Sequence, residues 1–412
     1  MKYNIALGIV CLSLLSLLVS CDKDDPISPS EPTTPSTTEE KLDAALESVI
    51  SEMEMPGFSL AIVKDGTLSF QQSFGFANLE QEIPYSNQTT QAIGSISKTF
   101  IGAAVVKAIE SGYFTLDTEI NDLLPFEINN PKAPGTNIKV KDLVTHTSGL
   151  LDNRDIYDAA YYIVPGENIN TPGAQLMINL LDVEQRSGTP LEAFLKAYYV
   201  PGGMLYSNDN FASAQAGQVY NYSNIASSLA AYIVEAATGQ AFDAYVKDQV
   251  FTPLGMDHTS YISGDQSATL YFDKSTPLPI YSNDSYPDGF VHTSNEDMTK
   301  YLLEMMRGAT GNNPVLFSET TYDLLFTPLL ADGIVPNVIG KNHGIFWTRN
   351  DASISHDGSD PGLNTVLQFF EDGETGFLLL TNMDSSTDEN EEQFVKAFLK
   401  IIEAISDFIS AN

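Results

Sequence analysis

The sequence predicts an α/β fold in which an antiparallel sheet, flanked by helices, carries an inserted and mostly helical lobe. Both chain ends pair a β-hairpin pattern with an amphipathic helical pattern, whereas the long middle of the chain has mainly helical periodicity. We therefore expect a sheet lobe from about 41–90 and 300–412 and a helical lobe at about 91–299. Clefts between two such lobes are favoured binding sites, so a site is expected where they meet.

The first folded element expected is a helix over residues 41–53. Its apolar residues fall at helical spacing, at Leu42, Leu46, Val49, Ile50 and Met53. Pro56-Gly57 ends this pattern. Two strands, 58–63 and 67–74, then flank the turn Lys64-Asp65-Gly66, which predicts a hairpin.

The C-terminal end repeats this arrangement. Strands at 365–370 and 376–381 flank the acidic turn 371–374, which predicts a second hairpin. One apolar face runs along the last segment, through Phe394, Phe398, Ile401, Ile405 and Phe408. A terminal helix should therefore cover a sheet built from both chain ends.

Residues 1–20 have the order of an export signal. Lys2 is followed by an apolar run from Ile5 to Val19, shorter than the roughly 20 residues that a membrane-spanning helix needs. The tetrapeptide at the end of this run, Leu18-Val19-Ser20-Cys21, resembles a bacterial lipobox, which implies cleavage before Cys21 and lipid on that cysteine. We expect an exported bacterial lipoprotein, anchored to a membrane through Cys21 and periplasmic or at the cell surface.

Residues 21–40 are predicted to be a disordered tether, because prolines recur among polar residues with almost nothing apolar to bury. The triplet Lys23-Asp24-Asp25 resembles surface-export signals of lipoproteins in some Gram-negative bacteria. The catalytic domain is expected at 41–412. The mature chain can form no intramolecular disulfide, because its other cysteine besides Cys21, Cys11, lies in the segment that would be removed.

The formal charge of −34, from 54 acidic and 20 basic residues, argues against a nucleic-acid partner. An acidic and therefore soluble exported surface is sufficient to explain it. The histidines are scattered and show no metal-ligand spacing, so neither a metal nor another cofactor is predicted.

The sharpest local motif is Gly94-Ser95-Ile96-Ser97-Lys98, at the start of a helical stretch that Gly112 closes. At a spacing of three, Ser95 and Lys98 share a helix face. A serine hydroxyl becomes a good nucleophile when a neighbouring base removes its proton, and lysine can act as that base when it is neutral. By itself this short motif recurs by chance.

A second motif strengthens the case. Tyr-Ser-Asn occurs three times, and the copies at Tyr206 and Tyr281 lie in Asn- and Ser-rich stretches that read as turns. The copy at Tyr222-Ser223-Asn224 is instead followed by an apolar helical run, 225–237. That context selects Tyr222 as a partner for Ser95 and Lys98.

Five landmarks occur in one order: Gly-Ser-Ile-Ser-Lys, His146-Thr-Ser-Gly-Leu, the Tyr222 helix, Pro253-Leu-Gly-Met and His356-Asp-Gly-Ser. Over roughly residues 41–405 the chain thereby resembles the class C β-lactamase-related serine hydrolases, which include D-alanyl-D-alanine carboxypeptidases, D-aminopeptidases and carboxylesterases. The resemblance implies a β-lactamase/transpeptidase-like fold. It also implies a penicillin-binding-protein-like hydrolase that forms an acyl-enzyme on small esters, amides or peptides.

The resemblance also implies roles for the motif residues. Ser95 attacks the carbonyl, and Lys98 with the Tyr222 phenolate takes the proton and returns it to the leaving group; which of the two is the base stays open. Asn224 is expected to hold Lys98 and the substrate amide. Gly358 lets a strand approach substrate closely, and the N–H groups of Ser95 and Ser359 are expected to form the oxyanion hole.

His356 stands where β-lactamases proper have lysine, and it is a candidate donor to the substrate or to Tyr222. Asp357 follows it, where the family often has threonine. If Asp357 faces the cleft, it repels a substrate carboxylate, so esters or amino-terminal peptides are expected to be better substrates than penicillins.

Two other functions remain open at this stage. A catalytically silent surface lipoprotein of the same fold would bind a cell-wall or peptide fragment, although the intact Ser95, Lys98, Tyr222 and Asn224 argue against it. An α/β-hydrolase with a Ser-His-Asp triad is disfavoured because the chain has no Gly-x-Ser-x-Gly motif. His146 is expected to shape a buried turn, and Trp347 to pack in the core.

Overall fold

The computed structural model describes residues 37–52, 55–264, 266–331, 333–334 and 342–411. The predicted export signal, Cys21 and most of the predicted tether therefore lie outside the described residues. The tether prediction is wrong for residues 38–40, which form the first turn of a helix. Within the described part of the chain, no helix is both long and apolar enough to cross a membrane.

One eight-stranded sheet organises the molecule, in the order β11-β12-β13-β14-β15-β1-β2-β3, and each pair is antiparallel. Both predicted hairpins are confirmed, as β1–β2 and β14–β15. Pairing of β1 with β15 joins the two ends of the chain, with Leu60 opposite Leu379. The strands are β1 (Gly57–Lys64), β2 (Thr67–Asn78), β3 (Ile83–Pro84), β11 (Asn342–His343), β12 (Thr348–Arg349), β13 (Ser353–Asp360), β14 (Leu363–Phe370) and β15 (Gly376–Thr381).

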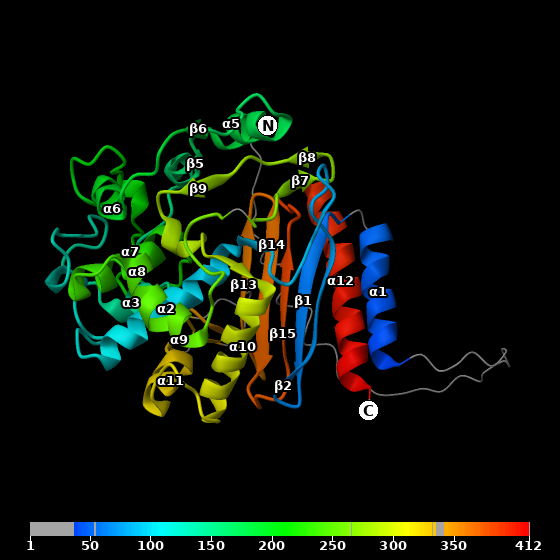
Figure 1. Ribbon diagram of the computed structural model, residues 1–412. Coiled ribbons are helices and arrows are strands. Elements are labelled where there is room, and N and C mark those ends of the chain that lie inside the picture. Colours follow the sequence, from blue (N-terminus) through cyan, green and yellow to red (C-terminus); the bar gives the residue numbers. More distant parts are fainter. Residues whose placement is uncertain (1–36, 53–54, 265, 332, 335–341, 412) are drawn as a thin grey trace, which may run out of the picture.

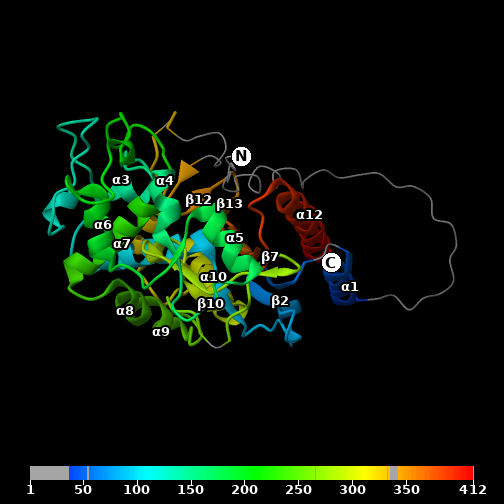
Figure 2. The ribbon, with the colours of Figure 1, turned by 90° about the horizontal axis from the view of Figure 1, so that it is seen from above.

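Two terminal helices cover one face of this sheet. Figures 1 and 2 show α1 (Thr38–Glu52) and α12 (Asp388–Ser410) side by side against it, as the amphipathic patterns predicted. Their buried residues pack on one set of β1 side chains, including Leu60 and Ile62. The alternate residues of β1, Ala61 and Val63, face the other layer, so the strand is apolar on both faces.

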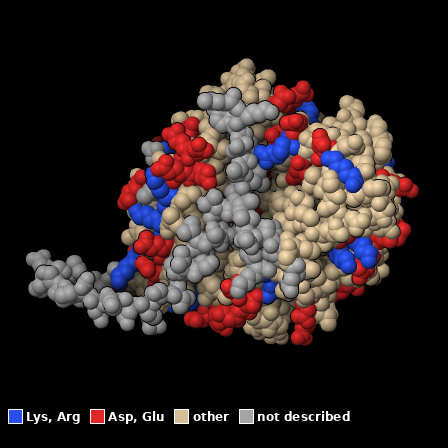
Figure 3. Space-filling view, turned by 180° about the vertical axis from the view of Figure 1, so that it is seen from behind, with Lys and Arg blue, Asp and Glu red and all other residues tan. Residues whose placement is uncertain are grey.

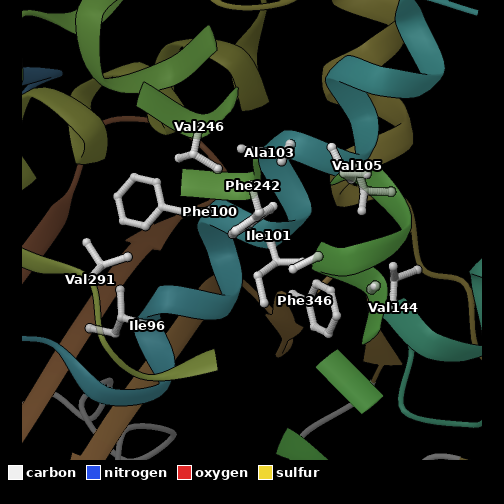
Figure 4. Close-up of a cluster of buried hydrophobic side chains, with 14 of the residues drawn as sticks. Ile96, Phe100, Ile101, Ala103, Val105, Val144, Phe242, Val246, Val291 and Phe346 are labelled. Atoms are coloured by element: carbon white, nitrogen blue, oxygen red, sulfur yellow. The ribbon is translucent and has the colours of Figure 1, made fainter. Parts of the chain in front are cut away.

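The opposite face of the sheet carries the helical lobe, with α2 (Ser97–Glu110) at its centre. Eleven of the fourteen α2 residues are buried, which explains why the helix is apolar almost all round. Figure 4 shows Phe100, Ile101 and Val105 of α2 among side chains from several other segments. Other helices of this layer are α7 (Asn224–Thr238), α10 (Asn295–Thr310) and α11 (Glu319–Phe326).

Further helices and small sheets complete the lobe. Its helices are α3 (Val140–Val144), α4 (Arg154–Tyr157), α5 (Pro172–Leu181), α6 (Leu191–Tyr199), α8 (Phe242–Val246) and α9 (Thr252–Leu254). Small sheets join β4 (Thr90–Ala92) to β10 (His292–Ser294), β7 (Tyr271–Asp273) to β8 (Thr276–Pro277), and β5 (Tyr161–Ile163) to β6 (Glu184–Gln185) and β9 (Tyr281–Asn283).

The β9 assignment corrects one prediction. Tyr281-Ser282-Asn283 is a strand, paired in register with β5, rather than a turn. Its polar sequence hides this role because the hydrogen bonds that fix it come from the backbone of another segment. The prediction for Trp347 is confirmed: the ring is fully buried and packs against Phe326 and Phe369.

The surface reflects the acidic composition. Figure 3 shows groups of Asp and Glu side chains across the face seen from behind, with Lys and Arg scattered among them. The visible described surface offers no continuous basic area of the kind that nucleic acid requires.

Candidate active site

Ser95 lies where the helical lobe meets the sheet. It belongs to a short 3-10 helix, Gly94–Ile96, that leads directly into α2. Gly94 has a φ of +53°, and a Cβ there would lie 2.9 Å from the backbone N of Ser359 in β13. Glycine is therefore required for the turn and for the close approach of β13 to Ser95.

Lys98 contacts Ser95 directly. Its Nζ donates a hydrogen bond to Ser95 Oγ at 3.0 Å and another to the backbone carbonyl of Asp288 at 2.9 Å. The side chain is fully buried. Burial lowers the pKa of Lys98, and the surrounding carboxylates, Asp288 and Asp360 first among them, oppose that shift only in part. A neutral amine beside a hydroxyl is the arrangement that a general base needs.

Tyr222 lies against the same pair. The Lys98 Nζ is 5.1 Å from the centre of the Tyr222 ring. Burial raises the pKa of Tyr222, and a hydrogen bond with the Ser95 side chain opposes the rise without cancelling it. Burial thus favours the neutral form of both groups, so the phenolate is disfavoured in the resting site and Lys98 is the better base.

His146 packs against Tyr222. The two ring centres are 4.4 Å apart, and the His146 Nδ1 accepts a hydrogen bond from the Ser223 backbone N at 3.3 Å. Burial lowers the pKa of His146, so the imidazole is neutral with its proton on Nε2. The buried turn expected at His146 is present, with a φ of +57°, and it also supports Tyr222.

Asp152 organises the start of α7. It accepts hydrogen bonds from the Ser223 hydroxyl at 2.8 Å, the Asn224 backbone N at 2.8 Å and the Ile225 backbone N at 3.1 Å. The Asn224 side-chain amide also donates to it, at 2.9 Å. The hydrogen bonds of Lys98 Nζ go to Ser95 and Asp288, so the expected contact between Asn224 and Lys98 stays a prediction. The amide is directed to a carboxylate at the helix N-terminus, where negative charge is favoured. Contact between Asn224 and substrate stays a prediction.

β13 brings its glycine against the nucleophile. A Cβ on Gly358 would lie 2.2 Å from the Ile93 carbonyl oxygen and 2.9 Å from the Ser95 backbone N. A Cβ on Gly94 would likewise lie 2.9 Å from the Ser359 backbone N, so the segments that carry the backbone N atoms of Ser95 and Ser359 approach each other closely. Two N–H donors so placed fit the requirement of an oxyanion hole.

His356 and Asp357 occupy opposite faces of β13. His356 pairs with Leu367, whose side chain belongs to the core of the helical lobe, and Asp357 pairs with Val366, which faces the terminal helices. The His356 Nδ1 lies 2.7 Å from the Asp357 carbonyl oxygen. Burial, with the charge of Lys98, lowers the pKa of His356 to about 3, so the ring is neutral.

Asp357 is half-buried and close enough to act on the site electrostatically. Its charge contributes to the raised pKa values of Tyr220 and Tyr222. Burial raises the pKa of Asp357 itself to about 6, which leaves it mostly ionised at neutral pH. The repulsion expected of this residue therefore acts through space, although its side chain does not share the face of His356.

Two further carboxylates near Lys98 were missed from the sequence. Asp288 is buried, and its carboxylate accepts hydrogen bonds from the hydroxyls of Ser285 and Ser228. Burial raises the pKa of Asp288 to about 6. Asp360 ends β13, and burial raises its pKa to about 7. Asp360 could have been found, since strand alternation puts it on the same face as His356 and Gly358. Asp288 lies in a Pro-Asp-Gly sequence that indicates only a turn.

Within the described residues, no group of three or more His, Cys, Asp or Glu side chains is arranged to hold a metal ion. The acidic side chains near Lys98 are instead held by hydroxyl and backbone donors.

The two-lobed fold with a Ser-x-x-Lys helix at the junction defines the β-lactamase/transpeptidase-like class. The chain belongs to the Beta-lactamase family, whose model matches residues 42–400, which confirms the predicted resemblance. It is 22% identical over 357 residues to the putative penicillin-binding protein PbpX of Bacillus subtilis (strain 168), covering 83% of this chain and 74% of that protein. It is 20% identical over 356 residues to protein flp of Staphylococcus aureus (strain MRSA252), covering 84% of this chain but only 64% of flp.

Solved structures agree on the fold. An octameric penicillin-binding protein homologue from Pyrococcus abyssi has a TM-score of 0.63 and 21% sequence identity, covering 88% of this chain and 77% of its own. A class C beta-lactamase has a TM-score of 0.62 and 18% identity, covering 89% of this chain and 96% of its own. At these identities the likeness shows the fold alone.

Proposed function

We propose that this protein is a serine hydrolase that forms an acyl-enzyme on small esters, amides or peptides, with Ser95 as nucleophile and Lys98 as general base. One observation carries the proposal: the buried Lys98 amine, whose pKa burial lowers, lies 3.0 Å from the Ser95 hydroxyl. In the reaction, Ser95 gives its proton to neutral Lys98 as its oxygen attacks the carbonyl carbon. The proton then passes to the leaving group, with Tyr222 beside the path.

The backbone N–H groups of Ser95 and Ser359 stabilise the oxyanion that develops in this step. Asn224 and His356 border the substrate. His356 takes part as a neutral imidazole, because burial holds its pKa near 3. A neutral residue at this position cannot pair with a substrate carboxylate as a lysine does.

Esters and amides without a carboxylate near the scissile bond are the favoured substrates, ahead of penicillins. The support is electrostatic: the amine of Lys98 is acted on by four carboxylates, those of Asp288, Asp360, Asp152 and Asp357. An anionic substrate would approach several carboxylates in a site that screens charge poorly. Turnover of a chromogenic cephalosporin at a rate near that of the p-nitrophenyl ester would contradict this preference.

Labelling with a fluorescent phosphonate tests the proposal. The wild-type protein should be labelled at Ser95 and should release p-nitrophenol from p-nitrophenyl acetate, and Ser95→Ala should do neither. Ser97→Ala is the matched control, since Ser97 is the first residue of α2, two positions from Ser95, and its hydroxyl oxygen accepts a hydrogen bond from the Val291 backbone N. Absence of labelling and turnover in the wild type would favour the catalytically silent binding protein.

We also propose that the chain is exported and anchored to a membrane through lipid on Cys21. The support is the order of charge, apolar run and Leu-Val-Ser-Cys in the sequence. In cells fed an alkyne fatty acid, the wild-type protein should incorporate the label and sediment with membranes. Cys21→Ser should lose the label. Equal incorporation in both proteins would refute the anchor.

A further inference from the structure

Asp360 acts electrostatically on Lys98 but has no part in the proton transfers described above. It is the last residue of β13, one position beyond the Ser359 N–H. Strand alternation directs its side chain to the same face as Gly358, whose Cα borders the Ser95 backbone. Asp360 thus lies two residues beyond Gly358 on the same face of β13, and its charge acts on Lys98.

The two oxygens of Asp360 have different surroundings. The Tyr161 hydroxyl donates a hydrogen bond of 2.5 Å to Oδ1, which fixes the carboxylate in place. Oδ2 accepts no hydrogen bond from the described residues, and it lies next to Gly289, where a Cβ would come within 3.0 Å of it. The side chain is half-buried, which means that part of it still reaches solvent. One oxygen is thus held and the other is available.

Within the described residues, Asp360 forms no ion pair with Lys, Arg or His. Lys98 is the cation that acts on it, but its Nζ is already bound to Ser95 Oγ and the Asp288 carbonyl. Burial accordingly raises the pKa of Asp360 to about 7. A carboxylate that is partly desolvated and lacks a cation is stabilised when a cation arrives.

The group best suited to bind Oδ2 of Asp360 is a positively charged hydrogen-bond donor. We propose that Asp360 binds a protonated amine of the substrate, so that the protein prefers esters, amides or peptides that carry an ammonium group near the scissile carbonyl. This inference rests on the proposed hydrolase function. A hydrogen bond between charged groups of this kind corresponds to a preference of about tenfold or more over a neutral group of the same shape.

Paired substrates test the inference. Glycyl, β-alanyl and γ-aminobutanoyl p-nitroanilides each present an ammonium at a different distance from the carbonyl, and each is compared with the acyl p-nitroanilide in which a methyl group replaces it. The measured quantity is the ratio of kcat/KM within each pair, at about pH 7.5, where most of these amines are protonated. The wild type should show a ratio of about ten or more for at least one chain length.

In Asp360→Asn that ratio should fall to about one, because the amide keeps the shape of the carboxylate but carries no charge. Asp65→Asn is the matched control for net charge. Asp65 lies in the β1–β2 turn with a φ of +53°, a conformation that asparagine also adopts, and its neighbour Gly66 bonds to the turn at the far end of β14 from Asp360. Asp360→Ser provides a second variant should Asp360→Asn fail to fold, as judged by thermal unfolding.

The outcomes separate two failures. A wild-type ratio near one for every pair, or a ratio that persists in Asp360→Asn and Asp360→Ser, would overturn the role of Asp360 while p-nitrophenyl acetate turnover still supports the hydrolase. If Asp360 served only to hold Tyr161, its variants would lower stability and leave the ratio unchanged. If neither Ser95 labelling nor ester turnover occurs, the proposed function fails and the inference fails with it.

Discussion

Replacing Lys98 with methionine separates the two candidate bases. Methionine has a similar volume, so Lys98→Met removes the amine that lies 3.0 Å from Ser95 Oγ without opening a large cavity. A positioned general base contributes about 10²- to 10⁴-fold to rate, and we expect acylation of Ser95 to slow by that factor. Tyr222→Phe should slow acylation by p-nitrophenyl esters less, because p-nitrophenolate leaves without needing a proton.

Lost activity in Lys98→Met should not come from unfolding. Burial lowers the pKa of Lys98 in the folded state, so the unfolded chain binds this proton more tightly and the free energy of unfolding rises with pH between the two pKa values. The ammonium form therefore destabilises the fold at neutral pH. Methionine removes that penalty and loses two hydrogen bonds worth about 1 kcal/mol each. The net change in Tm should be within about 4 °C.

Stopped-flow measurement of the p-nitrophenol burst gives the acylation rate directly. In the wild type this rate should rise with pH and reach half its maximum below the ordinary lysine pKa of 10.5, because the neutral amine is the active form. The reasoning is refuted if Lys98→Met keeps the burst rate within about threefold while Tyr222→Phe loses it. That result would assign the base to Tyr222.

Three other predictions concern the surroundings of the nucleophile. Gly358→Ala puts a Cβ 2.2 Å from the Ile93 carbonyl oxygen. Tm should therefore fall by an amount equivalent to about 1–3 kcal/mol, and Ser95 labelling should slow at least tenfold. Unchanged values would show that β13 can move away from Ile93. Asp152→Ala leaves four donors at the start of α7 unpaired and should cost about 2–5 kcal/mol in urea unfolding, where a loss below about 0.5 kcal/mol would contradict this account. Burial raises the pKa values of Asp288 and Asp360 in the folded state to about 6 and 7, so the folded protein binds their protons more tightly than the unfolded chain. The free energy of unfolding should therefore fall as pH rises from about 4 to 7, and it should fall less steeply in Asp360→Asn. Equal slopes in the two proteins would argue against the raised pKa of Asp360.

The parts of the fold that the sequence predicts best are those with a clear period. The apolar stripe of α12 and the segment 376–381, which is β15 with the expected bounds, are read directly from spacing. β13 is different. Its residues Ser-Ile-Ser-His-Asp-Gly-Ser-Asp contain a single apolar side chain, and the strand is specified by pairing with β14 rather than by its own composition.

The candidate site divides in the same way. Ser95, Lys98 and Tyr222 were predicted because each belongs to a motif with a fixed local spacing, and the structure brings all three together. Asp152 was not predicted, because nothing in the neighbouring Leu-Leu-Asp-Asn indicates that it meets a helix 72 residues further along the chain. Contacts of this kind follow from tertiary packing, which a short motif does not encode.

The carboxylates around Lys98 bear on the predicted repulsion of substrate carboxylates. Repulsion of substrate carboxylates was first attributed to Asp357 on condition that it faces the cleft, and its register with Val366 directs it to the other face of the sheet. The expectation no longer depends on that condition, since Asp288 and Asp360 act on Lys98 more strongly than Asp357 does. With His356 neutral and several carboxylates around the one amine of Lys98, the carboxylates dominate the local field. Such a field disfavours anions whichever way Asp357 points, and it favours a substrate that brings the missing positive charge.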